Sequence, residues 1–489
     1  MANNINTGLK ITNAPISPGY VVVNINGVGA ELGNGVTTKD CYFQLAFNQF
    51  STVEVGNGSP VNAAGITLLN QIWTWGGPAN GINGDNTIIQ RSSPVSVVGN
   101  HSFTIVANGG NCTAAIKTDG TCWSWGGNAS GILGDNTLSN RSSPTSVVGG
   151  HSFTFLLGPS TFLALKSDGT CWTWGTNASG ALGDNSAAGS RSSPVSVVGG
   201  HSFSTATLGV NVQFLTLKSD GTCWAWGDNT SGALGDNTSI TRSSPVSVVG
   251  NHVFSAINGN GGIKSNGSVW CWGSNSSGAL GDKTITNRLS PTSVVGNHLF
   301  TTALYLGMGD STCLKSDGTV WAWGSNSFGQ SGDNTSSSRS SPVSVVGGHS
   351  FTSIVSNAGF NILALKSDGT CWAWGLNSVG ELGDNSISSR SSPVSVVGNH
   401  SFTSVFASNQ NEVCFGLKSD GSLWGWGANL GGQLGDNSLS NRSSPVSVLS
   451  SGASIRTYGK IAAGDSFYWN NTIAGFSLTT SDRVDFIYV

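Results

Sequence analysis

The tripeptide Trp-x-Trp followed by Gly occurs eight times in this chain of 489 residues. The copies begin at Trp73, Trp123, Trp172, Trp224, Trp270, Trp321, Trp372 and Trp424. From the second Trp of one copy to that of the next, the steps are 50, 49, 52, 46, 51, 51 and 52 residues. A period near fifty residues indicates supersecondary units that are stacked or arranged in a ring. The repeat therefore decides the architecture before any single motif is considered.

The composition favours a β protein with many turns. The chain has 70 Gly residues, and only 9% of its residues are charged. No long stretch places apolar residues at helical spacing. The net charge of −3, without a basic run, gives no reason to expect nucleic acid as a partner. No apolar stretch is long enough to span a membrane, so we expect no membrane insertion.

One repeat, residues 94–141, contains four short β-rich runs. These runs are residues 96–98, 101–106, 113–117 and 121–125. Four short strands in about fifty residues are typical of one propeller blade. Trp123 and Trp125 lie two apart on a strand, so both should face the neighbouring blade. Trp172 and Trp174 repeat the pattern in the next copy.

An Asp and an Arg lie at the two ends of the polar loop that follows each Trp strand. Examples are Asp135 with Arg141, and Asp184 with Arg191. We interpret them as structural staples of the loop. They would form either a charge-assisted pair or an Asp cap with the Arg reaching backbone carbonyls. One carboxylate per loop is too few for calcium, so we expect no metal here.

The repeat resembles a known family. The text LKSDGTCWAWG at residues 365–375, followed by a Gly-Asp-Asn loop and Arg-Ser-Ser-Pro, is similar to the regulator-of-chromosome-condensation repeat. The resemblance covers about 400 residues and implies a β-propeller, usually of seven blades. The best-known member exchanges guanine nucleotide on a small GTPase, but no loop here matches an exchange-specific one. The resemblance therefore implies the fold and leaves the function open.

The repeat count predicts eight blades within residues 47–449, with seven blades and a stray hairpin as the alternative. Seven units run complete from Pro to Arg, counted from Pro94 onwards. Residues 48–91 lack the preceding Ser-Pro-Val-Ser-Val strand, which the chain supplies at residues 444–448. We expect this last strand to complete the first blade. Such an exchange of N- and C-terminal strands would close the ring and remove an exposed edge.

The two chain ends, residues 1–46 and 450–489, also read as strands and turns. Neither is long enough for its own core, so together they are expected to form a small discontinuous β-sandwich. Residues 21–43 and 459–488 resemble a small β domain of tailed-phage structural proteins. The propeller would then be inserted between Phe43 and Ile455. This resemblance implies a virion component with the β domain as mount and the propeller as displayed head.

The repeat uses nearly every residue that could perform acid–base or nucleophilic chemistry. All seven His occupy one repeat position, which we interpret as a polar strand residue that bonds a loop. No triad, metal-binding motif or phosphate loop emerges, so we expect no catalytic residue, no metal and no cofactor. The chain is therefore expected not to be an enzyme. The nine Cys are expected to be buried, reduced thiols.

The leading hypothesis is a non-enzymatic phage virion protein, such as a capsid decoration, a head fibre or a tail appendage. It would be assembled in the host cytoplasm, since the N-terminus has no Sec-type signal. Its expected partners are other virion proteins, further copies of itself, and a host receptor or glycan. The alternatives are an intracellular scaffold or exchange-factor-like propeller, and an exported adhesin. The lack of paired carboxylates disfavours a glycan hydrolase.

Partner contacts are expected where the repeats depart from their consensus. The most variable segments follow the run that begins at the His position. The candidate binding residues are Asn108, Asn111, Ser160, Asn211, Tyr305, Asp310, Asn357, Asn361, Asn409 and Glu412. A residue that departs from a repeated text is free of the packing rule, although drift would produce the same pattern.

Overall fold

The computed structural model describes residues 8–10, 20–24, 41–46, 49–55, 62–77, 79–209, 213–304, 306–357, 360–408, 412–449, 457–458 and 485–487. The chain divides into two compact units, which we describe separately. One contains Phe50–Val448, and the other combines Met1–Gln49 with Leu449–Val489. Within the described residues, no helix is long and apolar enough to cross a membrane. The helical elements there are three single 3-10 turns, η1 (Ala79–Gly81), η2 (Ala178–Gly180) and η3 (Thr230–Gly232).

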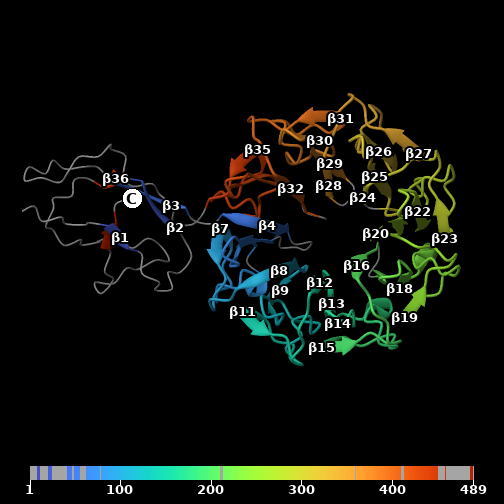
Figure 1. The fold of residues 1–489 in the computed structure, drawn as a ribbon, viewed down its shortest axis with the longest axis horizontal. Coiled ribbons are helices and arrows are strands. Elements are labelled where there is room, and N and C mark those ends of the chain that lie inside the picture. The colour runs from blue at the N-terminus through green and yellow to red at the C-terminus, as the bar shows by residue number, and fades with distance from the viewer. Residues whose placement is uncertain are drawn as a thin grey trace, which may run out of the picture. The chain divides into compact units, whose positions relative to one another are not determined.

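The larger unit is an eight-bladed β-propeller. Eight four-stranded antiparallel sheets follow one another around a ring, and each uses four strands that are consecutive in sequence (Figure 1). The first strand of each blade lies nearest the ring axis, and the fourth lies at the rim (Figure 1). The prediction of an all-β, eight-bladed propeller is confirmed, and the seven-bladed alternative is excluded.

The strands of blades 1 to 4 are, in order, β4 (Phe50–Val55), β5 (Asn62–Thr67), β6 (Ile72–Gly76), β7 (Arg91–Ser96); β8 (Phe103–Asn108), β9 (Cys112–Lys117), β10 (Cys122–Gly126), β11 (Arg141–Ser146); β12 (Phe155–Leu157), β13 (Thr161–Leu165), β14 (Cys171–Gly175), β15 (Arg191–Ser196); β16 (Thr205–Leu208), β17 (Phe214–Leu217), β18 (Cys223–Gly227), β19 (Arg242–Ser247).

The strands of blades 5 to 8 are β20 (Ala256–Asn258), β21 (Gly261–Ile263), β22 (Val269–Gly273), β23 (Arg288–Ser293); β24 (Thr302–Leu304), β25 (Asp310–Leu314), β26 (Val320–Gly324), β27 (Arg339–Ser344); β28 (Ser353–Asn357), β29 (Asn361–Leu365), β30 (Cys371–Gly375), β31 (Arg390–Ser395); β32 (Ser404–Ala407), β33 (Val413–Leu417), β34 (Leu423–Gly427), β35 (Arg442–Ser447).

The register of the fourth strand corrects the predicted blade boundaries. The Arg-Ser-Ser-Pro strand returns onto the Trp strand that precedes it, so that Gly126 pairs with Arg141 and Trp123 with Ser146. The sequence pattern predicts this strand at the start of the following blade, and that prediction is wrong. Pro144 is tolerated there because the fourth strand is the outer edge of its sheet, where no ladder hydrogen bond is lost.

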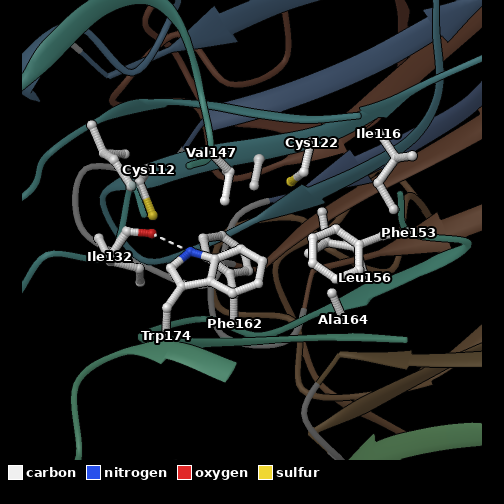
Figure 2. Packing of buried hydrophobic residues seen from close by; sticks show 12 residues of the cluster. Cys112, Ile116, Cys122, Ile132, Val147, Phe153, Leu156, Phe162, Ala164 and Trp174 are labelled. Carbon is white, nitrogen blue, oxygen red and sulfur yellow. Dashed lines mark hydrogen bonds between the residues drawn. The ribbon is translucent and has the colours of Figure 1, made fainter. Parts of the chain in front are cut away.

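The second Trp of every copy anchors the seam between two blades. At the seam of blades 2 and 3, Trp174 is fully buried and its indole Nε1–H donates to the Ile132 carbonyl at 2.9 Å (Figure 2). Cys112, Cys122 and other apolar side chains of blade 2 pack around the same ring. Eight such clusters fill the eight seams. Both Trp residues of a strand face the preceding blade, as predicted.

The ring closes without any exchange of strands, and the predicted exchange is wrong. Strand β35 pairs with β34 in blade 8, while blade 1 already has its own fourth strand, β7. The seam between blades 8 and 1 instead has the same kinds of hydrogen bond as the seven remaining seams. Trp75 Nε1 donates to the Gln433 carbonyl at 2.8 Å, Asn437 N donates to the Ser92 carbonyl, and Phe50 N donates to the Gly421 carbonyl. Hydrophobic packing and these bonds are sufficient to close the ring.

The second unit pairs strands from both chain ends. Strand β1 (Gly8–Lys10) pairs antiparallel with β37 (Asp485–Ile487). Strand β3 (Cys41–Ala46) lies between β2 (Tyr20–Asn24) and β36 (Thr457–Tyr458). The remainder of the predicted β-sandwich lies outside the described residues, so the sandwich stays a prediction.

Candidate binding face

The propeller has two faces with different loops. The loop face carries the connections from the first to the second strand and from the third to the fourth strand of each blade. The turn face carries the hairpin turns between the second and third strands and the connections between blades. Thus Gly127 N, in a third-to-fourth connection, donates to Asn111 O on the loop face. Phe153 N donates to Gly120 O, in a hairpin turn, on the turn face.

The loop face is stiffened by the predicted staples, which form ion pairs in all eight blades. Arg141 Nη2 lies 2.8 Å from Asp135 Oδ2, and Arg191 Nη2 lies 2.9 Å from Asp184 Oδ2. The other pairs are Asp85–Arg91, Asp236–Arg242, Asp282–Arg288, Asp333–Arg339, Asp384–Arg390 and Asp436–Arg442. Of the structural roles left open by the sequence, the charge-assisted pair is observed in all eight blades, and the Asp of each pair also caps its own loop.

Each staple Asp also holds its own loop. The other oxygen of Asp135, Oδ1, accepts hydrogen bonds from the backbone N–H and the hydroxyl of Thr137. Burial by itself would raise the pKa of Asp135, but the bonds from Thr137 and Arg141 more than offset it and lower the pKa. Asp135 is therefore ionised at neutral pH and fully used by the loop.

The same loop also forms a hydrogen bond to the next blade. Asn136 has a φ of 61°, a left-handed conformation that Asn adopts readily, and its N–H donates to the Ser192 carbonyl of blade 3. The staple therefore fixes the seam as well as the loop.

The predicted binding residues belong to the first-to-second connections, which all lie on the loop face. Asn111 and Ser160 are exposed there. Asn108, Asp310 and Asn361 are buried instead, and Glu412 is half-buried. Asn108 is a seam residue, because it donates to the Glu54 carbonyl and accepts from Thr113. Asn211, Tyr305, Asn409 and the side chain of Asn357 lie outside the described residues.

Blades 6 to 8 rebuild the loop that follows the Trp strand. Two residues before the Gly of the Gly-Asp segment, blades 1 to 5 carry Ile or Ala. Blades 6, 7 and 8 carry Gln330, Glu381 and Gln433 at that position, and all three are buried. Gln330 Oε1 accepts from Phe328 N at 2.9 Å, and Gln433 Oε1 accepts from Gly431 N at 2.7 Å. Glu381 accepts from the backbone N–H groups of Ser378 and Val379. Burying an amide or a carboxylate in place of an alkyl group is costly unless it is hydrogen-bonded.

The rebuilt loops display apolar side chains on the loop face. Phe328 of blade 6 lies edge-on to Phe360 of blade 7, with ring centroids 6.0 Å apart. The two rings remain 38% and 45% exposed, and Leu430 of blade 8 is 76% exposed. This pair was not predicted from the sequence. The available signal was Phe328 at a repeat position where blades 1 to 5 carry Asn or Ser.

The turn face carries a stack of three side chains in seven blades. In blade 4 the His201 ring lies 4.0 Å from the Trp224 ring, and Lys218 Nζ lies 4.4 Å from the same Trp ring. The other six stacks are formed by His101, His151, His252, His298, His349 and His400 on the first Trp of their blades. The His residues precede the strands, so their predicted role as strand residues is wrong.

The pKa of each stacked histidine is lowered, which favours the neutral imidazole. Burial lowers the pKa of His201, and the nearby Lys218 ammonium lowers it further. The eight described Cys are buried free thiols, and burial raises the pKa of Cys112 and Cys122 to about 12. Within the described ranges, no group of three or more His, Cys, Asp or Glu is arranged to hold a metal ion.

Comparison with known families finds the same repeat. The regulator of chromosome condensation (RCC1) repeat matches residues 220–258, 266–302, 368–414 and 420–468. A second description of that repeat matches residues 309–330.

Two curated proteins share the repeat region. The probable E3 ubiquitin-protein ligase HERC3 of Homo sapiens is 32% identical over 155 residues, which are 30% of this chain and 14% of HERC3. The ultraviolet-B receptor UVR8 of Arabidopsis thaliana is 28% identical over 131 residues, which are 26% of this chain and 30% of UVR8. The chain thus spans less than a third of either relative.

Two solved structures share the fold. Prp20p of Saccharomyces cerevisiae is 18% identical with a TM-score of 0.53, covering 70% of this chain and 90% of Prp20p. Human WBSCR16 is 17% identical with a TM-score of 0.55, covering 69% of this chain and 96% of WBSCR16. The chain therefore carries RCC1 repeats and folds, over residues 50–448, as a β-propeller similar to those of RCC1 proteins.

Proposed function

We propose that this chain is a non-enzymatic structural protein of a phage virion: a capsid decoration, a head fibre or a tail appendage. One observation carries the proposal. Strands that precede the propeller pair with strands that follow it, β1 with β37 and β3 with β36, in a unit of their own. Strands β2, β3 and β37 of this unit overlap residues 21–43 and 459–488, whose sequence resembles a small β domain of tailed-phage structural proteins.

The points at which the chain enters and leaves the propeller support separate roles for the two units. Strand β4 begins at the turn face and β35 ends there, so both connections leave the propeller on that side. The loop face is at the opposite end of every strand. We propose that the mounting unit binds other virion proteins, including further copies of itself. The loop face would contact a host receptor or glycan after assembly in the host cytoplasm.

The use of polar groups supports a non-enzymatic role. Eight Asp are held in ion pairs by eight Arg, and seven His are stacked on Trp rings. A catalytic centre needs a nucleophile or a base positioned beside a reacting atom. The repeat instead assigns these side chains to loops and seams. HERC3 is named as a probable ubiquitin-protein ligase, but the match with this chain covers only 14% of HERC3. That small share is no ground for proposing ligase activity here.

Mass spectrometry of purified phage particles tests the proposal. The chain should be present at a fixed copy number per particle and should be lost when residues 450–489 are deleted. A matched control replaces Leu138, an exposed loop residue, by Ser and should leave incorporation unchanged. Particles that lack the intact chain would contradict the virion role.

A second candidate is an intracellular scaffold or exchange-factor-like propeller. It is favoured by the RCC1 repeats and by the likeness to Prp20p, a protein described together with its binding to Gsp1p and histones. This candidate predicts tight binding to a nucleotide-free small GTPase that added guanine nucleotide reverses. Equal binding with and without nucleotide would exclude it.

A further inference from the structure

The innermost strands of the eight blades surround the axis of the ring (Figure 1). A propeller of this kind encloses a central channel. Both faces of each blade pack against neighbouring blades, so an exposed side chain of an innermost strand is open to the channel. Glu54 of β4 is such a side chain. It is also the only charged residue in the eight innermost strands, which are β4, β8, β12, β16, β20, β24, β28 and β32.

The Glu54 carboxylate has no counterpart within the described residues. Asn108 Nδ2 donates to the Glu54 backbone carbonyl at 3.0 Å, but no hydrogen bond or ion pair reaches the carboxylate from the described part of the chain. Strands β5, β8 and β32 pack against β4 and carry no acidic or basic side chain. The one ionisable group of β33, the Cys414 thiol, has a pKa raised well above its ordinary value and is therefore neutral.

The protein around the channel keeps bulk water from the Glu54 carboxylate. This desolvation raises the pKa of Glu54 to about 7, and no charged group contributes to the shift. The connection that follows β4, residues 56–61, contains no ionisable side chain either. Glu54 is therefore electrostatically isolated, and its negative charge is available to a ligand.

Apolar side chains occupy the position of Glu54 in five other blades. The register places Glu54 opposite Ala64 of the second strand. The equivalent residues, all half-buried, are Ala107, Leu157, Leu304, Val355 and Phe406. Phe406 of blade 8 packs on the seam cluster that contains Phe50 and Val53, so it lies beside the strand of Glu54. At this level the channel combines one carboxylate with apolar surface.

Hydroxyl groups line the end of the channel at the turn face. Every blade has an exposed Ser or Thr directly after the Phe that leads into its innermost strand. Each hydroxyl donates to a carbonyl of its own second strand, as Ser51 does to Ile66 and Thr403 does to Leu417. Because their hydrogens are used in this way, the exposed oxygens act as acceptors. The innermost strands therefore offer acceptors and one negative charge, and no cationic group.

We propose that the central channel binds a primary ammonium group carried on an aliphatic stem. The ammonium head would pair with the Glu54 carboxylate, and the stem would lie along Phe406 and Ala107 of the two adjacent blades. Charge complementarity identifies the ligand as a cation. The apolar neighbours select an alkylammonium group over a hard metal ion, which needs several oxygen ligands. The site goes beyond the proposed virion role and does not depend on it.

Isothermal titration calorimetry of the full chain tests the inference with three probes. They are hexylamine, hexanol as the neutral compound of the same length, and a Ser/Gly peptide that contains one lysine. The chain should bind hexylamine at pH 8, and Glu54→Gln should weaken this binding by about ten- to a hundredfold, the loss expected for one hydrogen bond to a charged group. Binding of the peptide as well assigns the site to a lysine of a partner protein, and binding of hexylamine alone assigns it to a small amine.

The pH dependence of the affinity tests the role of the carboxylate. Glu54 is charged only above its raised pKa, so the affinity for hexylamine should rise as the pH increases through about 7. Glu54→Gln should remove this rise. A raised pKa also means that Glu54 lowers the stability of the folded chain at pH 8, where the acid is ionised. Glu54→Gln should therefore not lower the urea midpoint at pH 8, so weaker binding would not reflect unfolding.

A matched control separates the channel from general charge attraction. Asp228→Asn removes an acid from the connection between β18 and β19 on the loop face of blade 4, and should leave the affinity unchanged. The inference would be overturned by equal affinity for hexanol, by equal losses in Glu54→Gln and Asp228→Asn, by an affinity that does not change with pH, or by no binding of hexylamine.

Discussion

The two faces of the propeller are formed by the same repeat, yet they differ in how strictly they follow it. On the turn face, seven blades repeat one His–Trp–Lys stack, with His-to-Trp ring distances of 4.0 to 4.4 Å. On the loop face, the rim repeats eight ion pairs, while the inner connections and the loops of blades 6 to 8 depart from the pattern. The difference teaches that a substitution away from the repeat consensus costs least stability where no seam depends on the residue. Such positions are open to selection for binding.

The largest expected effect lies at a seam that both faces share. Trp226→Ala should lower the free energy of unfolding by about 3–5 kcal/mol, because the ring is fully buried and its N–H bond to Ala181 O is lost. Trp224→Ala, in the partly buried stack of the same strand, should cost distinctly less. Urea unfolding followed by circular dichroism measures both. Equal losses would show that the stack is as important as the seam.

The next effect concerns the repeated part of the loop face. Asp236→Asn should cost about 1–3 kcal/mol, since the side chain is buried and bonds Arg242, Thr238 and Asn229. Arg242→Gln should cost less than about 1 kcal/mol, because a third of the Arg side chain faces solvent. The double variant gives the coupling between them. A coupling of zero would reduce the staple to two independent loop contacts.

A pH titration tests the turn face. The pKa of each stacked His is lowered by burial and by its Lys, so the unfolded chain binds more protons than the folded one. Stability should therefore be full above the unfolded His pKa near 6.5 and should fall as the pH drops through the lowered folded values. Urea midpoints measured from pH 8 downward would show the loss. His201→Gln should reduce the slope, and an unchanged slope would contradict the assignment.

The smallest expected effect on stability is at the exposed aromatic pair of the loop face, Phe328 and Phe360. Phe360→Ala should change the free energy of unfolding by less than about 0.5 kcal/mol, because the ring is half-exposed. A large loss of stability would place Phe360 in a seam and remove the contrast between the faces.

The sequence was sufficient to predict the fold where a residue type can take only one structural role at its position. A Trp two positions after another on a strand must face the same way, and the second one is buried in every seam. The Asp and Arg at the two ends of a loop could be recognised as loop staples, and the structure shows that they form ion pairs. The eight copies of the repeat predicted eight blades, and the sheet topology decided against the alternative of seven.

The sequence was insufficient to predict features that depend on which residues pair in space. Arg-Ser-Ser-Pro-Val-Ser reads equally well as a first or as a fourth strand, and only the pairing of Gly126 with Arg141 shows which. The His position looked like a strand, because its stacking on a Trp some twenty residues later in the chain carries no periodic signal. Glu381 resembled a scattered acid until its bonds to Ser378 and Val379 were seen.

The seam between blades 8 and 1 has the same contacts as the other seven, yet it is the only one that the propeller chain does not cross. Pairing β1 with β37 and β3 with β36 keeps Phe50 and Val448 on a short tether. A tether raises the effective concentration of the two halves of a seam for each other. The second unit thus adds a second connection between the two sides of this seam, besides the propeller chain itself, and favours reclosure of the ring. A circular permutant cut at another seam should need the same help at its new opening.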